Sequence, residues 1–292
     1  MTPIRIRLRF NSLEALSLVD ERKNENAIAA VIAADALGLP KSKMKPLYVE
    51  RSIFDVDPDT PIHRIVPTEY LLEDIRNRQL THTRISPRIW GDKAENPLLN
   101  RHYPDAAARG TFTLNGVVEN MFGSCWSLTI LDGFYDWLMF SHGKPSVRVE
   151  STPKRLLSAV MNDANPYYEL QHAIGKVRYS TPEELDRKFS SSSPDQYFDG
   201  LGHGIYLSLM SLADNVKDET EVRLVCDFMF RQTWVQQNMR LELDLLKVPF
   251  YWTDVIRSVA IGPYVPEKDR APIEQELRRL GVIGPIAISS AS

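Results

Sequence analysis

Alternation of apolar and polar residues predicts short strands along the whole chain. In a half-buried strand, successive side chains point to opposite faces, so apolar residues recur at every second position. Val147 and Val149 flank Arg148 with this period. The strand candidates are Ile4–Phe10, Ile62–Val66, Leu80–Arg84, Thr111–Leu114, Gly123–Thr129, Ser146–Glu150, Gly175–Tyr179, Glu221–Phe228, Arg240–Leu245 and Val255–Ile261.

Other stretches carry apolar residues at the helical spacing of three and four. Phe134, Trp137 and Leu138 follow it. The predicted helices are a stretch from Leu13 after Asn11 and Ser12, Asn26–Leu37, the run from Pro67 to Ile75, Leu131–Phe140, Pro153–Met161 with Thr152 as N-cap, Ile205–Leu212 and Pro272–Leu280. The predicted connections are Asp55–Pro61, Trp90–Pro104 and the serine-rich run Ser190–Pro194.

Short strands that alternate with helices in this order predict an α+β, or mixed α/β, fold built on a split mixed β-sheet flanked by helices. We expect two units: a strand and helix layer over residues 1–60, and a larger domain over residues 61–292. Gly200, Gly202 and Gly204 follow a serine-rich loop rather than a strand, so they are a weak signal for a dinucleotide fold.

The composition is typical of a globular protein. The chain has 292 residues, 43% of them hydrophobic, and a net charge of −3 from 35 basic and 38 acidic side chains. This balance shows no overall basic excess for binding nucleic acid, although it leaves a local basic groove open. Two cysteines cannot form a disulfide framework, and Met1–Phe10 does not read as a signal peptide. With no apolar run of about 18 residues, we expect a cytoplasmic protein.

Several short motifs stand in a recognisable order. They are Ile62–Val66 with Arg64, Leu71-Leu72, Gln79-Leu80, Trp90-Gly91-Asp92 with Glu95 and Asn96, Cys125-Trp126-Ser127, Trp137, Ser146–Val149, Gly175–Tyr179, Glu219–Arg223 and Val259–Pro263. Together they resemble a widespread bacterial family known only as a domain of unknown function, over about residues 60–285. That family often carries a lysine before the paired glutamates, where this chain has Leu209-Met210-Ser211-Leu212.

The polar residues of these motifs also resemble those of ADP-ribosyltransferases. Such enzymes place an Arg or His on a first strand, a Ser-x-Thr pair on a second and a Glu-x-Glu pair on a third. Here Arg64, Ser127-Leu128-Thr129 and Glu219-Thr220-Glu221 follow that order. The resemblance implies an ADP-ribosyltransferase-like core with NAD as substrate, and Arg64, Ser127, Glu219 and Glu221 as the catalytic set.

The chemistry of NAD cleavage explains these residue types. Breaking the bond between nicotinamide and ribose builds positive charge on the ribose, which a nearby carboxylate stabilises. Arginine offers a fork of donors for phosphate or ribose, and a hydroxyl can hold the carboxylate or the nicotinamide amide. In a strand, residues i and i+2 share a face, so Glu219 and Glu221 can serve one pocket.

Alternatives remain for most of these residues. His63 is the alternative to Arg64 on the first strand, and we favour Arg64 because it shares a face with Ile62 and Val66. Glu221 could simply pair with Arg223. For NAD binding we add His63, Ser127, Thr129, Tyr135 and Trp90 to Arg64, while Trp137 fits a core position better.

Three functions compete at this point. The first is transfer of ADP-ribose from NAD to a protein or nucleic-acid acceptor, as a toxin or phage-defence effector. The second is a non-enzymatic module that senses a nucleotide in the same cleft. The third is an assembly protein with a decayed pocket, which the missing lysine favours. None of the six histidines has metal-ligand spacing, so we expect no metal.

Overall fold

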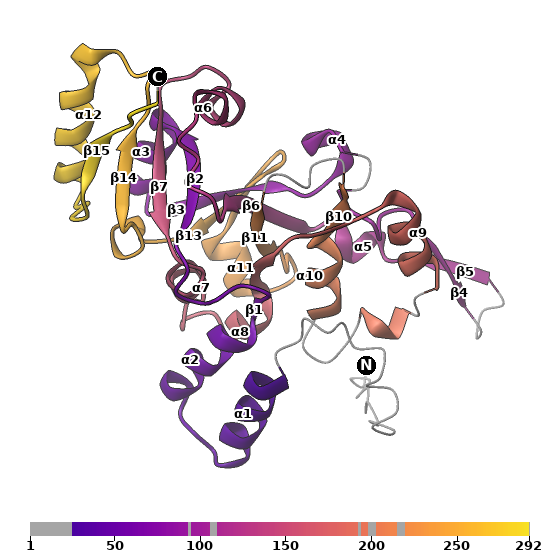
Figure 1. The fold of residues 1–292 in the computed structure, drawn as a ribbon. Helices are drawn as coiled ribbons and strands as arrows, with labels where there is room; N and C mark the ends of the chain where they lie inside the picture. The colour runs from indigo at the N-terminus through magenta and orange to yellow at the C-terminus, as the bar shows by residue number, and fades with distance from the viewer. Residues whose placement is uncertain are drawn as a thin grey trace.

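The computed structural model describes residues 25–92, 95–105, 110–191, 194–197, 203–214 and 220–291. Figure 1 shows a large sheet with helices on both sides. The predicted strand Ile4–Phe10, the predicted helix from Leu13 and the candidate Glu219 lie outside the described ranges.

The main sheet is mixed, as expected. Its path runs through β1 (Ile53–Phe54), β8 (His172–Lys176), β11 (Glu221–Asp227), β6 (Met121–Ser127), β2 (Ile62–Pro67), β7 (Ser146–Ser151), β14 (Ser258–Ile261) and β15 (Ile286–Ile288). A branch adds β3 (Gln79–Arg84), β13 (Leu245–Pro249) and β12 (Arg240–Glu242). The β1–β8 and β14–β15 pairs are parallel, and the other pairs are antiparallel.

The sheet splits at β6. Near its end, Ser127 pairs with His63 of β2, whereas Gly123 and Phe122 near its start pair with Thr83 and Arg84 of β3. β2 and β3 therefore diverge from the same strand, which confirms the predicted split in a mixed sheet.

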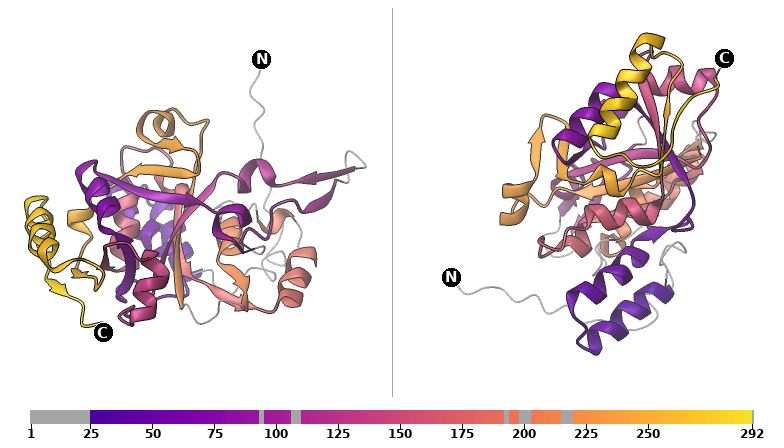
Figure 2. Two further views of the ribbon diagram at one scale, coloured as in Figure 1. Left: turned by 90° about the horizontal axis from the view of Figure 1, so that it is seen from above. Right: turned by 90° about the vertical axis from the view of Figure 1, so that its left-hand side faces the viewer.

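Twelve α-helices lie in the described ranges. They are α1 (Glu25–Ala36), α2 (Lys41–Arg51), α3 (Thr68–Arg76), α4 (Pro87–Trp90), α5 (Asn115–Val118), α6 (Phe134–Ser141), α7 (Pro153–Val160), α8 (Tyr168–Gln171), α9 (Pro182–Ser191), α10 (His203–Leu209), α11 (Thr233–Asn238) and α12 (Glu267–Arg279). The pair α1–α2 projects from one edge of the body (Figures 1 and 2). None of the described helices is both long enough and apolar enough to cross a membrane.

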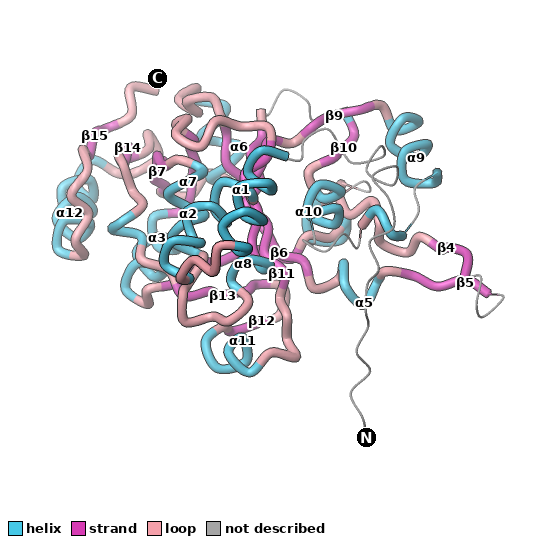
Figure 3. Tube along the Cα trace, turned by 90° about the horizontal axis from the view of Figure 1, so that it is seen from below, coloured by secondary structure: helices cyan, strands magenta, loops and turns pink. Residues whose placement is uncertain are grey.

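The two faces of the sheet differ in their covering. One face, the core face, carries Ile62, Trp126 and Val222, which pack with α3, α7 and α11 in the largest apolar cluster. The other, the site face, is covered by α6 at one end and by α5, α9 and α10 at the other. Figure 3 shows α10 and α9 well apart from the α6 end. The centre of the site face thus lies between two separate groups of helices.

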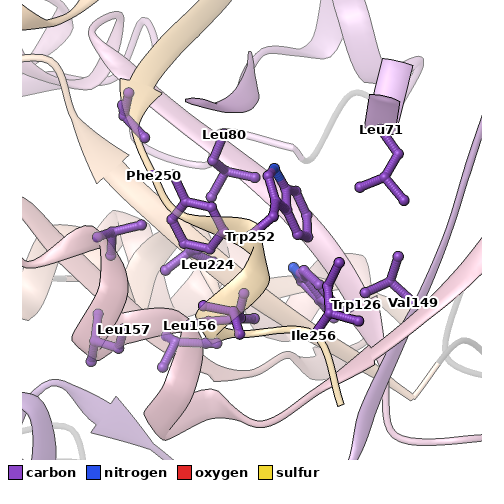
Figure 4. Close-up of a cluster of buried hydrophobic side chains, with 14 of the residues drawn as sticks. Leu71, Leu80, Trp126, Val149, Leu156, Leu157, Leu224, Phe250, Trp252 and Ile256 are labelled. Atoms are coloured by element: carbon purple, nitrogen blue, oxygen red, sulfur yellow. The ribbon is translucent and has the colours of Figure 1, made fainter. Parts of the chain in front are cut away.

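Aromatic side chains fill the centre of the core face (Figure 4). The Trp126 and Trp252 ring centroids lie 6.5 Å apart, and Phe250 meets Trp252 edge-on at 5.0 Å. The indole N–H of Trp252 donates to the Gln79 carbonyl at 2.8 Å, so the buried ring keeps its polar partner.

Sequence predictions that depend only on neighbouring residues in the chain are confirmed. The Thr152 hydroxyl accepts from the Arg155 N–H at 3.3 Å and caps α7. Val222, Leu224 and Cys226 share the core face, as their alternation predicted.

Four predicted segments are corrected. Gly175–Tyr179 is two strands, because β8 ends at Lys176 and β9 (Arg178–Ser180) pairs with β10 (Ser211–Ala213) in a separate sheet. The predicted helix Ile205–Leu212 therefore ends at Leu209. Arg240–Leu245 is a hairpin that turns at Leu243, which takes φ of 55°.

The fourth correction concerns the last helix. It begins at Glu267 rather than Pro272: Glu267 and Asp269 lie in its first turn, where acidic side chains are favourable, and Pro272 lies inside the helix at the loss of one backbone hydrogen bond. Helices α2 and α9, and the strand pair β4 (His102–Asp105) and β5 (Gly110–Thr113), were partly or wholly missed. β1 joins the main sheet, while a domain boundary at residue 60 stays a prediction.

Two histidines are buried side by side on the core face. His82 and His172 have ring centroids 6.3 Å apart, and none of their ring nitrogens has a hydrogen-bond partner. Burial lowers the pKa of His172 to about 3. Burial, His172 and Arg64 hold the pKa of His82 well below its ordinary value.

These histidines predict acid sensitivity. Between about pH 6.5 and pH 3 the unfolded chain protonates residue 172 while the native state does not. For one such group, the free energy of unfolding therefore decreases by about 1.4 kcal/mol for each unit by which the pH is lowered. We expect His172→Leu to flatten this loss in urea denaturation, with little change near pH 7.5. The exposed His102→Gln is the control, and equal pH slopes for His172→Leu and wild type would contradict the prediction.

Candidate functional site

A row of polar side chains crosses the site face. His63 of β2 pairs with Ser127 of β6, and Ser127 pairs with Glu221 of β11. Cross-strand partners point to the same face, so the three side chains lie next to one another. All three are buried, with exposures of 4%, 3% and 4%. The structure thus brings together one predicted residue from each of three strands.

Three hydroxyl groups link this row to the surface. Ser127 Oγ lies 2.8 Å from Thr129 Oγ1 and 3.3 Å from Thr220 Oγ1, and the two threonine oxygens lie 3.3 Å apart. Ser127 is buried, whereas Thr129 is exposed. Thr220 takes φ of 42°, an uncommon conformation for a β-branched residue, and such outliers cluster at functional sites.

Glu221 is held by a buried arginine. Arg223 Nε donates to Glu221 Oε1 at 2.8 Å, and Nη2 reaches Glu221 Oε2 at 3.2 Å. Nη1 donates to Glu95 Oε2 at 2.8 Å and to the Leu209 carbonyl at 2.9 Å. The Arg223 side chain has no exposed surface. We call Glu95, Arg223 and Glu221 the carboxylate–arginine cluster.

Two neighbours complete this cluster. The Arg223 guanidinium carbon lies 4.7 Å from the centre of the Trp90 ring, and the Trp90 indole N–H donates to the Arg84 carbonyl at 2.7 Å. Burial and Glu221 raise the pKa of Cys125 well above its ordinary value. The thiol is therefore neutral, which argues against a nucleophilic role. Trp90 packs on Arg223, so its role in NAD binding stays a prediction.

His63 is a neutral imidazole in this setting. Burial and the nearby Arg148 lower the pKa of His63, while Glu150 acts in the opposite direction. A neutral imidazole offers one donor and one acceptor, and the buried Nδ1 of His63 has no partner. In the described ranges no three His, Cys, Asp or Glu side chains are placed to hold a metal ion.

Arg64 lies on the opposite face. It does share a face with Ile62 and Val66, as the sequence indicated, but that face packs against α3 and the main core. Its charge acts on the core-face groups Asp74 and His82 and also on Cys125 of the site face. The apolar neighbours that favoured Arg64 belong to the core face, so His63 rather than Arg64 lies in the row, while the role of either residue in NAD binding stays a prediction.

Exposed apolar side chains occur on the segment that follows Thr129 in the chain. Tyr135 on α6 is 78% exposed, and Ile130, directly after Thr129, is 61% exposed. Phe134 packs edge-on against Tyr135 with centroids 5.9 Å apart. Trp137 is fully buried with Ile65 and Leu131, as expected for a core residue. Tyr135 is thus available for stacking, which keeps it as a candidate.

Two surface hollows lie away from the row. One of about 280 Å³ is lined by Asn96, Arg101 and Phe189 among others. Another of about 540 Å³ is lined by Arg84, Arg88 and Asp244 among others, and both arginines pair with Asp244. Neither hollow includes His63, Ser127 or Glu221 in its lining, so the chemistry of the row, rather than the size of a hollow, identifies the candidate site.

Comparison with known proteins gives a distant structural likeness. No family model and no curated protein matches this chain. The likeness is to Thermus sp. 2.9 DarT. Its complex with ADP-ribosylated ssDNA aligns with a TM-score of 0.34 at 12% identity, covering 80% of this chain and 96% of that one. Its complexes with carba-NAD+ and NAD+ give TM-scores of 0.33 and 0.30 at 11% and 14% identity, covering 80% of this chain and 97% and 96% of theirs. Because these TM-scores and identities are low, we interpret the site from the residues of this chain alone.

Sequence reasoning missed the importance of Glu95. It appeared only as a residue near the Trp90-Gly91-Asp92 motif, although it contacts Arg223 across 128 positions. Thr220 was passed over as the spacer in Glu-x-Glu, yet its hydroxyl joins the Ser127 group. The available signal was the ordered series of motifs, which already held Trp90, Glu95 and Arg223.

The carboxylate–arginine cluster predicts a large loss of stability on removing Arg223. Arg223→Met leaves two buried carboxylates without their partner, and breaking a buried pair in this way costs about 3–5 kcal/mol. Urea denaturation measures the loss. Arg279→Met is the control, because Arg279 pairs with Glu276 at the surface and should cost less than about 1 kcal/mol. Equal losses for both variants would contradict the prediction.

Proposed function

We propose that this protein transfers ADP-ribose from NAD to an acceptor, with His63, Ser127 and Glu221 at the centre of the site. The observation that carries the proposal is the cross-strand row on the site face, where an imidazole, a hydroxyl and a carboxylate stand at paired positions of three neighbouring strands. The acceptor, whether protein or nucleic acid, and a role as toxin or phage-defence effector belong to the same proposal.

In this reaction the bond between the ribose carbon and the nicotinamide nitrogen breaks. The electron pair leaves with nicotinamide, whose ring becomes neutral, and the ribose carbon gains positive charge. An acceptor oxygen or nitrogen then bonds to that carbon and gives up its proton to a carboxylate, the role that we propose for Glu219. Glu221 would stabilise the positive ribose, since a fixed carboxylate in a dry site acts strongly on developing charge.

The remaining residues fit binding roles. The neutral imidazole of His63 would bind a ribose or amide edge through one donor and one acceptor. Ser127, Thr129 and Thr220 would orient the nicotinamide amide or the Glu221 carboxylate through their hydroxyl groups. Tyr135 would stack on a ring of NAD from the exposed side. Arg64 has no role in this proposal, because it lies on the core face.

A second candidate is a module that binds a nucleotide without cleaving it. The observation that favours it is the state of Glu221, whose two oxygens both accept from Arg223 and whose side chain is 4% exposed. A carboxylate used only to hold the sheet together would show the same contacts.

NAD consumption and nicotinamide release decide between these functions. We expect turnover in wild type and a loss of about 100- to 1,000-fold in Glu221→Gln, the range found for removing one stabilising group from a transition state. His63→Ala should lose activity, whereas Arg64→Met should retain it if the variant folds, which thermal unfolding checks.

The opposite ranking, with Arg64→Met inactive and His63→Ala active, would refute the proposed arrangement. No turnover in wild type, combined with NAD raising the Tm of both wild type and Glu221→Gln, would establish the binding module instead. If wild type shows no NAD turnover and NAD does not raise its Tm, both functions are ruled out.

A further inference from the structure

The carboxylate–arginine cluster carries an excess of negative charge. It holds two carboxylates and one guanidinium, and the exposures of Glu95, Arg223 and Glu221 are 5%, 0% and 4%. Within the described ranges Arg223 is the cation paired with each glutamate. With both glutamates ionised, the cluster has a net charge of −1 away from solvent.

Burying an unbalanced charge is costly unless a proton or a cation compensates for it. The proposed reaction supplies a cation twice: on the nicotinamide ring of NAD, and on the ribose while the bond breaks. A low-dielectric site makes the attraction between such a cation and the cluster stronger than it would be in water. The excess charge is therefore of the sign and size that the reaction needs.

The geometry also assigns a mechanical role to Glu95. Its carboxylate accepts from Nη1 at 2.8 Å and from Nη2 at 3.3 Å, on the side of the guanidinium away from the Nε–Glu221 contact. Trp90 covers the guanidinium plane, and the Leu209 carbonyl takes a further N–H. These contacts restrain Arg223, and Arg223 in turn restrains the orientation of Glu221. Charge-assisted bonds of this kind fix geometry well.

We propose that Glu95 is a positioning residue that orients Glu221 through Arg223 and gives the cluster the net negative charge that stabilises the cationic ribosyl group. The inference rests on the proposed ADP-ribosyl transfer. Glu95 and Glu221 bind the same guanidinium, so Glu95 acts on Glu221 through Arg223.

Steady-state kinetics of NAD consumption test this role in Glu95→Gln, Glu95→Asp and the control Glu69→Gln. Glu69 is an exposed carboxylate paired with Lys144 at the surface. We expect Glu95→Gln to lower kcat about 10- to 100-fold, the range for residues that orient a site from behind, while KM for NAD changes less than about twofold. Glu95→Asp should recover part of kcat, and Glu69→Gln should match wild type.

An unchanged kcat in Glu95→Gln, or a rise in KM alone, would overturn the positioning role. A purely structural role would lower kcat only in proportion to the fraction unfolded, which is measured on the same samples by circular dichroism. It would also give no recovery with aspartate beyond the recovery of folding.

The net negative charge of the carboxylate–arginine cluster can be tested by protein stability, independently of NAD turnover. Burial raises the pKa of Glu95, with Arg223 acting in the opposite direction. The native state then holds this proton more tightly than the unfolded chain, so wild type should lose stability relative to Glu95→Gln as pH rises above about 4.5, and the difference should become constant before neutral pH, once Glu95 is ionised in the native state as well. Parallel pH profiles in urea denaturation, or a difference that still grows at neutral pH because Glu95 keeps its proton, would overturn the buried charge. If wild type shows this difference but consumes no NAD, the charged cluster stands, while the proposed function and the catalytic part of the inference fall together.

Discussion

The fully buried guanidinium of Arg223 constrains the surrounding structure more than any single apolar contact. A charge without exposed surface has to satisfy its donors within the protein, and Arg223 does so with Glu221, Glu95 and the Leu209 carbonyl. These partners come from β11, from the chain after α4 and from the end of α10. One side chain therefore links three segments, of which the one with Glu95 is 128 positions away from Arg223 in sequence.

The sheet separates this polar arrangement from the main apolar core. Adjacent side chains on β11 point to opposite faces of the sheet: Val222 lies in the core, between the site-face residues Glu221 and Arg223. The same alternation divides His63 from Arg64 on β2. A shift of one residue in register would exchange the two faces, so the packing of the core determines which polar side chains reach the site.

This dependence explains how far the sequence could predict the molecule. The Thr152 cap and the Val222 face are local, and both were predicted. The break at Val177 depends on pairing with a distant strand, β10, and no local pattern marks it. The choice between His63 and Arg64 likewise required knowing which face α3 covers, and Glu95 needed its contact with Arg223. The sequence thus allowed the types of site residue to be predicted, but not the residues that they contact in the fold.

The position of the hydroxyl groups gives the site a direction. Thr129 is exposed next to Ile130, while Ser127 behind it is buried and pairs across the strands with Glu221. Under the proposed function, a ligand that enters along this line would meet the apolar Ile130 first, then neutral donors and acceptors, and last the Glu221 carboxylate. Burial increases along the same line, so under the proposed function the electrostatic effect of Glu221 would be greatest where the hydroxyl groups end. The strained backbone of Thr220 lies at that junction, which joins the entrance to the charged interior.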